Sequence, residues 1–445
     1  MYTIKNIIRN EFGFALPSVL FIATILTVLI FSLIVLQYLR TKETLIDIAK
    51  VKAMNAATSG IEKVINEVEK FGRYNSESTL SHFQFTFDDG GESSVDVIPW
   101  GGYLFVQATG RSGKIKHAKS ALVGYYPPKE FSKALIFDNQ EHQLILTGNV
   151  NITGDVVVGN RGVTIGTLRN YQTPRRIPIE GNITRLSSSG AYYFNISDYS
   201  KSIQKTERLI QEQNSEVFVS GNLLTLENIP ENQNIINING NCTISGVLKR
   251  AKGIVLIKSD GNITITNGTD INGFVLFKAK GKIVVEGNTR LNNVIVISED
   301  SIAIKSNASI AGQIFAPKIS IESQVRVTYP SIVCLTPSKK NGALLVQTGA
   351  IIEGTVLIST QTKTSQISFE SGSSVYGALY SETNIDFNTS LFGTLITKDF
   401  QFYDAPTQYY GWMRSGEINR KKLPDGYMIP FGFSTASHLG ILDWQ

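Results

Sequence analysis

Between residues 253 and 397 the sequence repeats a short pattern at intervals of about 20 residues. Each repeat contains an apolar run that begins at a glycine or a residue in its place, and these starting residues lie 20, 20, 19, 19, 23, 23 and 16 positions apart. A second series of short runs, rich in Ile and Val, falls between them. Two short strands in each period predict a solenoid, here a parallel β-helix, and strand crossovers favour a right-handed winding.

The two series, called column one and column two below, differ in character. Column one starts where the chain must bend, at Gly253, Gly273, Asn293, Gly312, Ser331, Gly354, Gly377 and Gly393. Glycine and asparagine tolerate positive φ at the least cost, which suits a sharp bend. Column two comprises residues 263–265, 283–285, 302–304, 319–321, 344–346, 367–369 and 385–387. Its alternation predicts one face on a stacked aliphatic core, with Thr, Ala or Ser outside.

A row of polar residues follows column two directly. Its members are Thr266, Glu286, Lys305, Glu322, Gln347, Glu370 and Asn388. They should stack at the rung spacing of about 4.8 Å, with Glu286, Lys305 and Glu322 alternating in sign. A row of catalytic carboxylates would set like charges side by side, which is destabilising, so the pattern favours a solvated ladder of ions.

The amino-terminal region carries a long apolar segment. From Phe12 to Leu39 there is no charged side chain, and the short leader before it contains Lys5 and Arg9. A helix of this length exceeds the roughly 30 Å hydrocarbon core of a bilayer and is too long for the core of a signal peptide. The basic leader places the amino terminus in the cytoplasm, so residues after Arg40 should face the periplasm or the outside.

The helix should continue beyond the membrane as an amphipathic stem. Apolar and small residues recur there at three- and four-residue steps, among them Ala53, Ala56, Ala57, Gly60 and Ile61. The small residues let another backbone approach closely, and Gly72 is a natural end. We therefore expect a helix over residues 14–72. A generic juxtamembrane helix is the alternative interpretation.

A basic leader that ends in Gly13 and is followed by Phe14 and a long apolar helix resembles the processing site of type IV prepilins and pseudopilins. The resemblance implies cleavage between Gly13 and Phe14 by a prepilin peptidase and N-methylation of Phe14. It also implies that the helix packs with those of other pilin subunits in a filament core. Residues 53–62 further resemble the stem of minor pilins of the PilX and GspK type. The resemblance covers about residues 9–70.

One position departs from the family pattern. Members usually carry glutamate as the fifth residue after the cut, where this sequence has Ser18. In major subunits that carboxylate offsets the buried terminal ammonium of the neighbour nearer the tip. A subunit at the very tip has no such neighbour, so Ser18 is compatible with a tip or priming subunit.

The segment that follows the stem has strand patterns. Phe83, Phe85 and Phe87 alternate with polar residues, and the Pro127-Pro128 pair interrupts the chain. A helix backed by a few antiparallel strands is the arrangement of a pilin head. We therefore expect a small pilin-like β domain over residues 74–128.

The expected β-helix spans residues 135–400, with an insertion at about 167–215. The insertion contains a predicted helix and several arginines and tyrosines, namely Arg169, Arg175, Arg176, Tyr192 and Tyr193. It is either a binding loop or an amino-terminal cap on the solenoid. Residues 401–445 are aromatic and basic, which favours a cap over the open end of the solenoid. Contact with single-stranded nucleic acid or a glycan is the alternative for that segment.

Catalytic chemistry is not indicated by the sequence. There are 4 histidines and 2 cysteines, no HExxH or CxxC motif, no phosphate-binding glycine loop and no nucleophile elbow. We expect no enzyme activity, no metal, no cofactor and no small-molecule substrate. Cys242 and Cys334 lie in apolar strand patterns, and we interpret both as small apolar side chains that point into the core. Export would also permit a disulfide between them.

Together these features predict a mainly β protein with a leader (1–13), a membrane and stem helix (14–72), a small sheet and a parallel β-helix. The predicted function is that of a non-catalytic minor pilin in a type IV pilus or secretion pseudopilus, near the tip and held in the inner membrane. Its head would prime assembly or contact a surface, glycan or DNA. The alternatives are a membrane-anchored β-helix scaffold similar to bactofilins and a β-helix polysaccharide-active enzyme.

Overall fold

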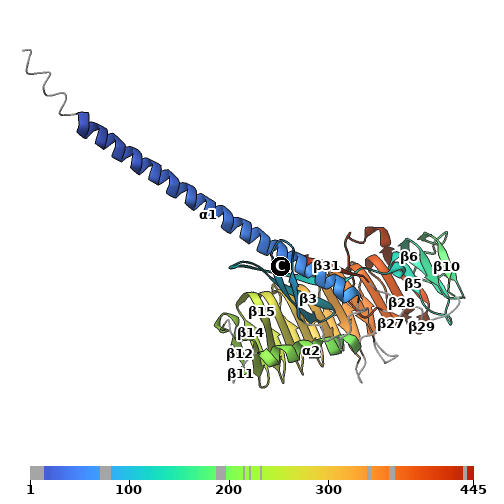
Figure 1. Cartoon of the computed structure of the whole chain (residues 1–445). Coiled ribbons are helices and arrows are strands. Elements are labelled where there is room, and N and C mark those ends of the chain that lie inside the picture. The colour runs from blue at the N-terminus through green and yellow to red at the C-terminus, as the bar shows by residue number, and fades with distance from the viewer. Residues whose placement is uncertain are drawn as a thin grey trace, which may run out of the picture. The chain divides into compact units, whose positions relative to one another are not determined.

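A computed structural model describes residues 15–70, 82–186, 197–213, 216–219, 222–230, 233–337, 342–359, 366–433 and 438–444 (Figure 1). The chain forms two compact units, each described by itself. Unit 1 comprises residues 1–64, 82–96 and 107–120, and unit 2 comprises residues 65–81, 97–106 and 121–445. Gly13, Phe14 and Gly72 lie outside the described residues.

Unit 1 contains most of the long helix α1, which runs from Ala15 to Lys70. Its apolar part is long and apolar enough to cross a membrane by length and composition, with a mean hydropathy of 3.0. Strands β1 (His82–Thr86) and β2 (Glu92–Trp100) pair antiparallel in the same unit, from His82 opposite Asp96 to Thr86 opposite Glu92.

The small sheet has the strand order β1-β2-β3-β4-β31. Strands β3 (Tyr103–Ser112) and β4 (Ile115–Tyr125) follow β2 in the chain, whereas β31 (Leu439–Trp444) is the last strand. Within unit 2, β31 pairs antiparallel with β4, beginning with Leu439 opposite Tyr125. The region between these two strands is therefore an insertion into the sheet. The sheet accordingly includes a strand from outside the expected range 74–128.

The insertion is a parallel β-helix, which confirms the predicted fold class (Figure 1). The strands of column one are β11 (Glu216–Val219), β13 (Ile235–Ile238), β15 (Val247–Ser259), β17 (Asp270–Ala279), β19 (Arg290–Ser298), β21 (Ser309–Ala316), β23 (Arg326–Leu335), β25 (Ile351–Ile358), β27 (Ser374–Ile385) and β28 (Ser390–Asp404). Those of column two are β12 (Leu223–Thr225), β14 (Cys242–Ser245), β16 (Ile263–Ile265), β18 (Ile283–Val285), β20 (Ile302–Ile304), β22 (Lys318–Ile321), β24 (Ala343–Val346) and β26 (Gln366–Phe369). Residues 385–387 contribute an isolated bridge, Asp386 to Ser368, at the end of column two.

Column-one strands are longer than the sequence pattern suggested because they begin before the bend. In β17 and β19, residues 270–272 pair with 290–292, the register then shifts, and residues 275–279 pair with 294–298. Each turn therefore presents three strand segments around the core, two of them from one bent strand. Inward Ile, Val and Leu side chains from both columns form one continuous buried cluster.

The segment that precedes the repeats in sequence stacks on their far end. It contains β5 (Leu135–Phe137), β6 (Leu144–Thr153), β7 (Val156–Val158), β8 (Val163–Ile165), β9 (Ile179–Glu180) and β10 (Ile183–Arg185). β5 pairs with β28, β7 pairs with β5, and β10 pairs with β7. Because a parallel stack accepts any complementary strand edge, spatial order need not follow chain order. Helix α2 (Ser197–Gln213) comes between β10 and β11 in the sequence.

The carboxy-terminal segment also enters the stack, which differs from the expected cap. β29 (Thr407–Tyr410) pairs antiparallel with β28, and β30 (Trp412–Asn419) lies between β28 and β6. Leu391 is opposite Ile418, which in turn is opposite Ile152. The short 3₁₀ helices are η1 (Lys129–Ser132), η2 (Leu226–Asn228) and η3 (Arg420–Lys422).

Cys242 and Cys334 are free and buried. Burial raises the pKa of the Cys242 thiol to about 11 and that of Cys334 still further, so neither forms a reactive thiolate near neutral pH. Cys242 belongs to the buried cluster inside the solenoid, as expected. Cys334 lies on β23 between Val333 and Leu335, which do belong to that cluster, so its side chain points to the other face of the strand.

Candidate functional site

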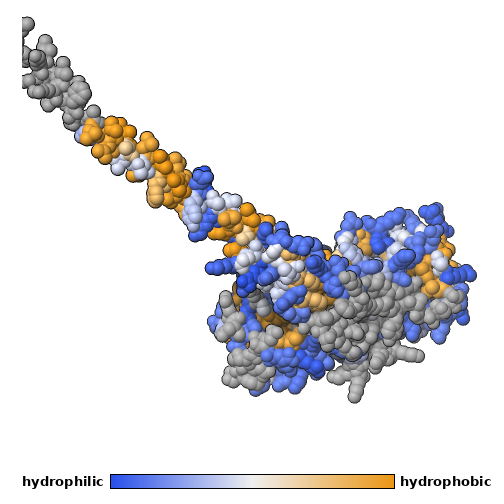
Figure 2. All heavy atoms as spheres, viewed as in Figure 1, coloured by the Kyte–Doolittle hydropathy of each residue, from blue (hydrophilic) through white to orange (hydrophobic). Residues whose placement is uncertain are grey.

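The first candidate surface is the apolar part of α1. Its large apolar side chains between Leu16 and Leu39 are exposed, and hydrophobic residues cover this part of the helix surface (Figure 2). Leu16, for example, is 74% exposed. Ser18 lies on the same exposed segment. An exposed apolar helix surface of this length needs a lipid or protein environment to cover it.

The lower part of α1 packs within unit 1. Ala53, Ala57 and Ile61 are fully buried, and Ala56 and Gly60 are buried beside them. A Cβ atom placed on Gly110 of β3 would overlap the Ala53 carbonyl oxygen, so helix and strand backbones are in direct contact. The predicted small residues do permit close approach of a backbone, but that backbone belongs to the protein's own sheet.

The bends of column one have two different physical causes. At Gly253 (φ +81°) and Asn293 (φ +58°) the backbone is left-handed, which these residue types tolerate. At Gly312 the φ is ordinary, but a Cβ would overlap the carbonyl oxygen of Val294 on the neighbouring turn. The column therefore also marks close contact between successive turns.

The outer face of column one is covered within unit 2. The ring of Trp100 meets Phe274 edge-on at a centroid distance of 5.1 Å. Gln313, itself buried, accepts a hydrogen bond from the Gly102 amide at 2.7 Å and donates one to the Trp100 carbonyl at 2.8 Å. Phe274 and Gln313 of this face are therefore not available to a ligand.

A second cover comes from the carboxy-terminal segment. The Tyr427 hydroxyl lies 2.7 Å from the Thr355 hydroxyl and accepts a hydrogen bond from the Ala378 amide at 3.0 Å. Desolvation by burial raises the pKa of Tyr427 well above its ordinary value, so this hydroxyl keeps its proton. Tyr427 therefore holds the carboxy-terminal segment against column one.

Helix α2, which belongs to the expected insertion at about 167–215, also covers column one. Ser202 of α2 donates a hydrogen bond to the Gly101 carbonyl at 2.7 Å, and Glu207 pairs with Lys278 of β17 at 2.7 Å. The insertion's Arg169, Arg175 and Arg176 are exposed, while Tyr192 and Tyr193 lie outside the described residues. In its described helix the insertion thus packs on the solenoid.

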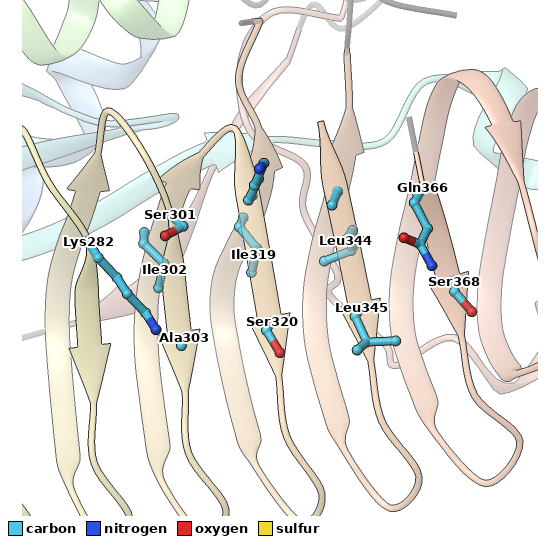
Figure 3. A pocket seen from close by; sticks show the side chains of 12 residues that line it. Lys282, Ser301, Ile302, Ala303, Ile319, Ser320, Leu344, Leu345, Gln366 and Ser368 are labelled. Carbon is cyan, nitrogen blue, oxygen red and sulfur yellow. The ribbon is translucent and has the colours of Figure 1, made fainter. Parts of the chain in front are cut away.

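The outer face of column two contains an open groove with a volume of about 280 Å³ (Figure 3). Ala303, Ser320, Leu345 and Ser368 succeed one another along it, with Lys282 and Gln366 beside them. The groove offers hydroxyl, amide and ammonium groups over an aliphatic floor. Such a surface can make hydrogen bonds, but paired carboxylates for acid–base catalysis are not among its lining residues.

The polar row beside this groove contains a formed ion pair. Lys305 Nζ lies 2.7 Å from Glu322 Oε1. The hydrogen bond from Lys305 is the main cause that lowers the pKa of Glu322 below its ordinary value. Glu322 is therefore ionised near neutral pH and pairs with Lys305 on the adjacent turn.

Residues 142 and 399, which are far apart in sequence, form a close pair that sequence reasoning missed. His142 Nδ1 lies 2.5 Å from Asp399 Oδ2, and Asp399 Oδ1 accepts hydrogen bonds from the Phe400 and Gly411 amides. Desolvation raises the pKa of Asp399 despite these bonds. In the described part of the chain, no group of three or more His, Cys, Asp or Glu residues could hold a metal ion.

Comparisons with known proteins identify no family. No family profile and no curated protein matches the chain. Among solved structures, the crystal structure of the competence-associated pilin ComZ from Thermus thermophilus matches with 10% identity and a TM-score of 0.19, covering 89% of this chain and 97% of that one. A TM-score this low carries no conclusion. The class is therefore defined by the chain itself: a mainly β protein with a long apolar helix and a parallel β-helix inserted into a small sheet.

Proposed function

We propose that this protein is a non-catalytic, minor pilin-like subunit of a type IV pilus or a related secretion filament. The observation that carries the proposal is the division of α1 into two parts. The amino-terminal part of the helix is apolar and exposed. In the carboxy-terminal part, Ala53, Ala57 and Ile61 are buried in the core of unit 1. A simple membrane anchor does not need its helix to continue into the core of the attached domain.

The amino-terminal residues add support through the resemblance described above. Gly13 and Phe14 stand where a prepilin peptidase of the inner membrane would cut and where N-methylation would follow. Ser18 in place of the usual glutamate removes a buried carboxylate that only a subunit with a neighbour nearer the tip would need. We therefore place the subunit at or near the tip, with the β-helix projecting to prime assembly or contact a surface.

The lack of catalysis is part of the proposal. The covered face of column one, the paired Glu322 and the mixed side chains of the groove favour a binding or structural role. An enzyme of the β-helix type would instead need acidic groups that converge from neighbouring turns.

Amino-terminal sequencing of the membrane-extracted protein tests the proposal. We expect a mature chain that starts at N-methylated Phe14, and Gly13→Leu should leave the leader attached. Asn10→Ala, a matched change within the leader, should leave cleavage intact. An unprocessed Met1 in the wild-type protein would contradict the proposal and support the membrane-anchored, bactofilin-like scaffold.

Antibody labelling of sheared filaments tests the position. We expect label at filament ends and a loss of filament number when the subunit is deleted. Label distributed along the shaft would remove the tip assignment while leaving the pilin assignment in place.

A further inference from the structure

Beyond the solenoid core, β28 continues as one arm of a two-stranded antiparallel ribbon with β29. Gln401 pairs with Tyr410, Phe402 with Tyr409, and Tyr403 with Gln408. Since side chains alternate between the faces of a strand, Phe402 and Tyr409 share one face. The other face carries Gln401, Tyr403, Gln408 and Tyr410, and we call these four residues the ribbon face.

The opposite face of the ribbon, which carries Phe402 and Tyr409, packs against other side chains. The rings of Phe402 and Tyr409 stack at a centroid distance of 4.9 Å, and Phe402 is buried. The Arg414 guanidinium lies 4.7 Å from the Phe402 ring and makes two hydrogen bonds, of 2.8 and 3.1 Å, to the carboxylate of Asp386. The ribbon face is thus displayed on a fixed support.

The two tyrosines of the ribbon face contribute little to packing. Tyr403 is 64% exposed, and within the described part of the chain its side chain makes no hydrogen bond or ring contact. Tyr410 is 44% exposed, and its ring stacks on His142 at 5.6 Å. His142 is in turn held by the buried Asp399, so the Tyr410 ring has a defined orientation.

Amide groups stand beside these rings. The carbonyl oxygen of the Gln401 side chain accepts a hydrogen bond from Asn384 at 2.7 Å, which leaves the Gln401 amide nitrogen to donate to a ligand. The Gln408 amide nitrogen donates to the Phe402 carbonyl at 3.1 Å, which leaves the Gln408 carbonyl oxygen to accept. The ribbon face therefore combines two exposed rings with one donor and one acceptor.

Charge decides between the ligands that bind exposed aromatic rings. Between Lys398 and Arg414 the sequence contains two aspartates and no basic residue, and Arg414 is already bound to Asp386. Single-stranded nucleic acids bind where aromatic rings are combined with a positively charged groove, since phosphate contacts supply much of the affinity. Residues 401–410, which form the ribbon, contain Asp404 and no lysine or arginine, so the ribbon itself does not supply that positive charge.

We propose that the ribbon face binds a neutral glycan. A pyranose ring has an apolar C–H face that can lie on tyrosine rings and hydroxyl groups at its edge that can pair with amides. As a surface contact of the projecting head, this deepens the proposed function and rests on it for its role in the cell.

Affinity electrophoresis of the detergent-solubilised full-length protein tests the proposal. Native gels would contain a β-glucan, a mannan or glycol chitin, and we expect at least one of them to retard the wild-type protein. Tyr403→Ala and Tyr410→Ala should each weaken binding roughly tenfold, because each removes one stacking ring. Tyr403→Phe keeps the ring and should keep most of the affinity.

Tyr126→Ala is the matched control, since Tyr126 is 50% exposed but lies outside the ribbon, and its binding should equal that of the wild type. Circular dichroism would verify that each variant is folded. The proposal is overturned if none of the three polymers retards the wild-type protein. It is also overturned if the wild-type protein instead binds a 30-nucleotide oligothymidylate and Tyr403→Ala and Tyr410→Ala weaken that binding. The assay requires neither leader cleavage nor filaments, so its failure is distinct from failure of the pilin proposal.

Discussion

The two strand columns of the solenoid contribute to the same core but differ on their outer faces. From Gly354 to Ile358, column one is buried at every residue, because Tyr427 and other segments of unit 2 cover it. In column two, β18 alternates between buried Ile283 and Val285 and half-buried Val284. A strand covered on both faces requires a continuous apolar run, whereas a strand covered on one face requires alternation.

The comparison implies that outward substitutions in column one should destabilise the protein and that equivalent changes in column two should not. Four experiments test this difference, in order of decreasing expected effect.

Gly377→Val should have the largest effect. A Cβ there would overlap the Gly354 carbonyl oxygen and lie 2.9 Å from the Tyr427 ring, and the backbone φ is +142°. We expect a loss of about 3–5 kcal/mol in the free energy of unfolding, measured with urea. Ser368→Val in the column-two groove is the control and should change stability by less than about 0.5 kcal/mol. Equal losses would contradict the comparison.

Gln313→Ala should have the second-largest effect on stability. It would leave the buried Gly102 amide and Trp100 carbonyl without their partners and should cost about 2–4 kcal/mol. Gln366→Ala, an exposed glutamine of column two, should be nearly neutral in the same urea titration. If the two variants unfold at the same denaturant concentration, the cover on column one contributes no stability.

Tyr427→Phe removes only the hydroxyl that accepts the Ala378 amide, and we expect a loss of about 1–2 kcal/mol. Tyr403→Phe, at an exposed tyrosine, should leave the thermal midpoint unchanged. A midpoint for Tyr427→Phe that also matches the wild type would show that this hydrogen bond is dispensable.

Glu322→Gln should have the smallest effect on the free energy of unfolding, below about 1 kcal/mol, because the pair with Lys305 is partly exposed to solvent. The pKa of Glu322 is lowered on folding, so its contribution is present above the ordinary glutamate pKa and is lost as the pH falls through the lowered value. The free energies of unfolding of the wild type and the variant should therefore differ at pH 7 and become equal at acidic pH. A constant difference across that range would exclude this ion pair as the cause.

Sequence reasoning recovered the repeating elements because each is a local pattern. The starting residues of column one, most strands of column two and the long apolar helix appear in the structure at the expected places, whereas residues 385–387 form only an isolated bridge. The continuous apolar runs of column one also indicate that its outer face is covered, because a strand that is buried on both faces needs apolar residues at successive positions.

The contacts between distant segments could not be read in the same way. Leu135 pairs with Leu395, His142 with Asp399, and Leu439 with Tyr125, and no local pattern connects the members of these pairs. The stem illustrates the same limit, since Ala53 and Ala57 signalled a close backbone neighbour but not that it would be Gly110 of the same chain.

By itself, the sequence determined the long apolar helix, the repeated strands of the two columns, and which side of column two faces the core, because period and residue size control these features locally. Only the tertiary structure decided the order of the turns, the strand β31 that closes the small sheet, and the exposed tyrosines of the ribbon face. Parallel strands offer nearly equivalent backbone edges to one another, so the choice among them depends on how the whole set of side chains packs.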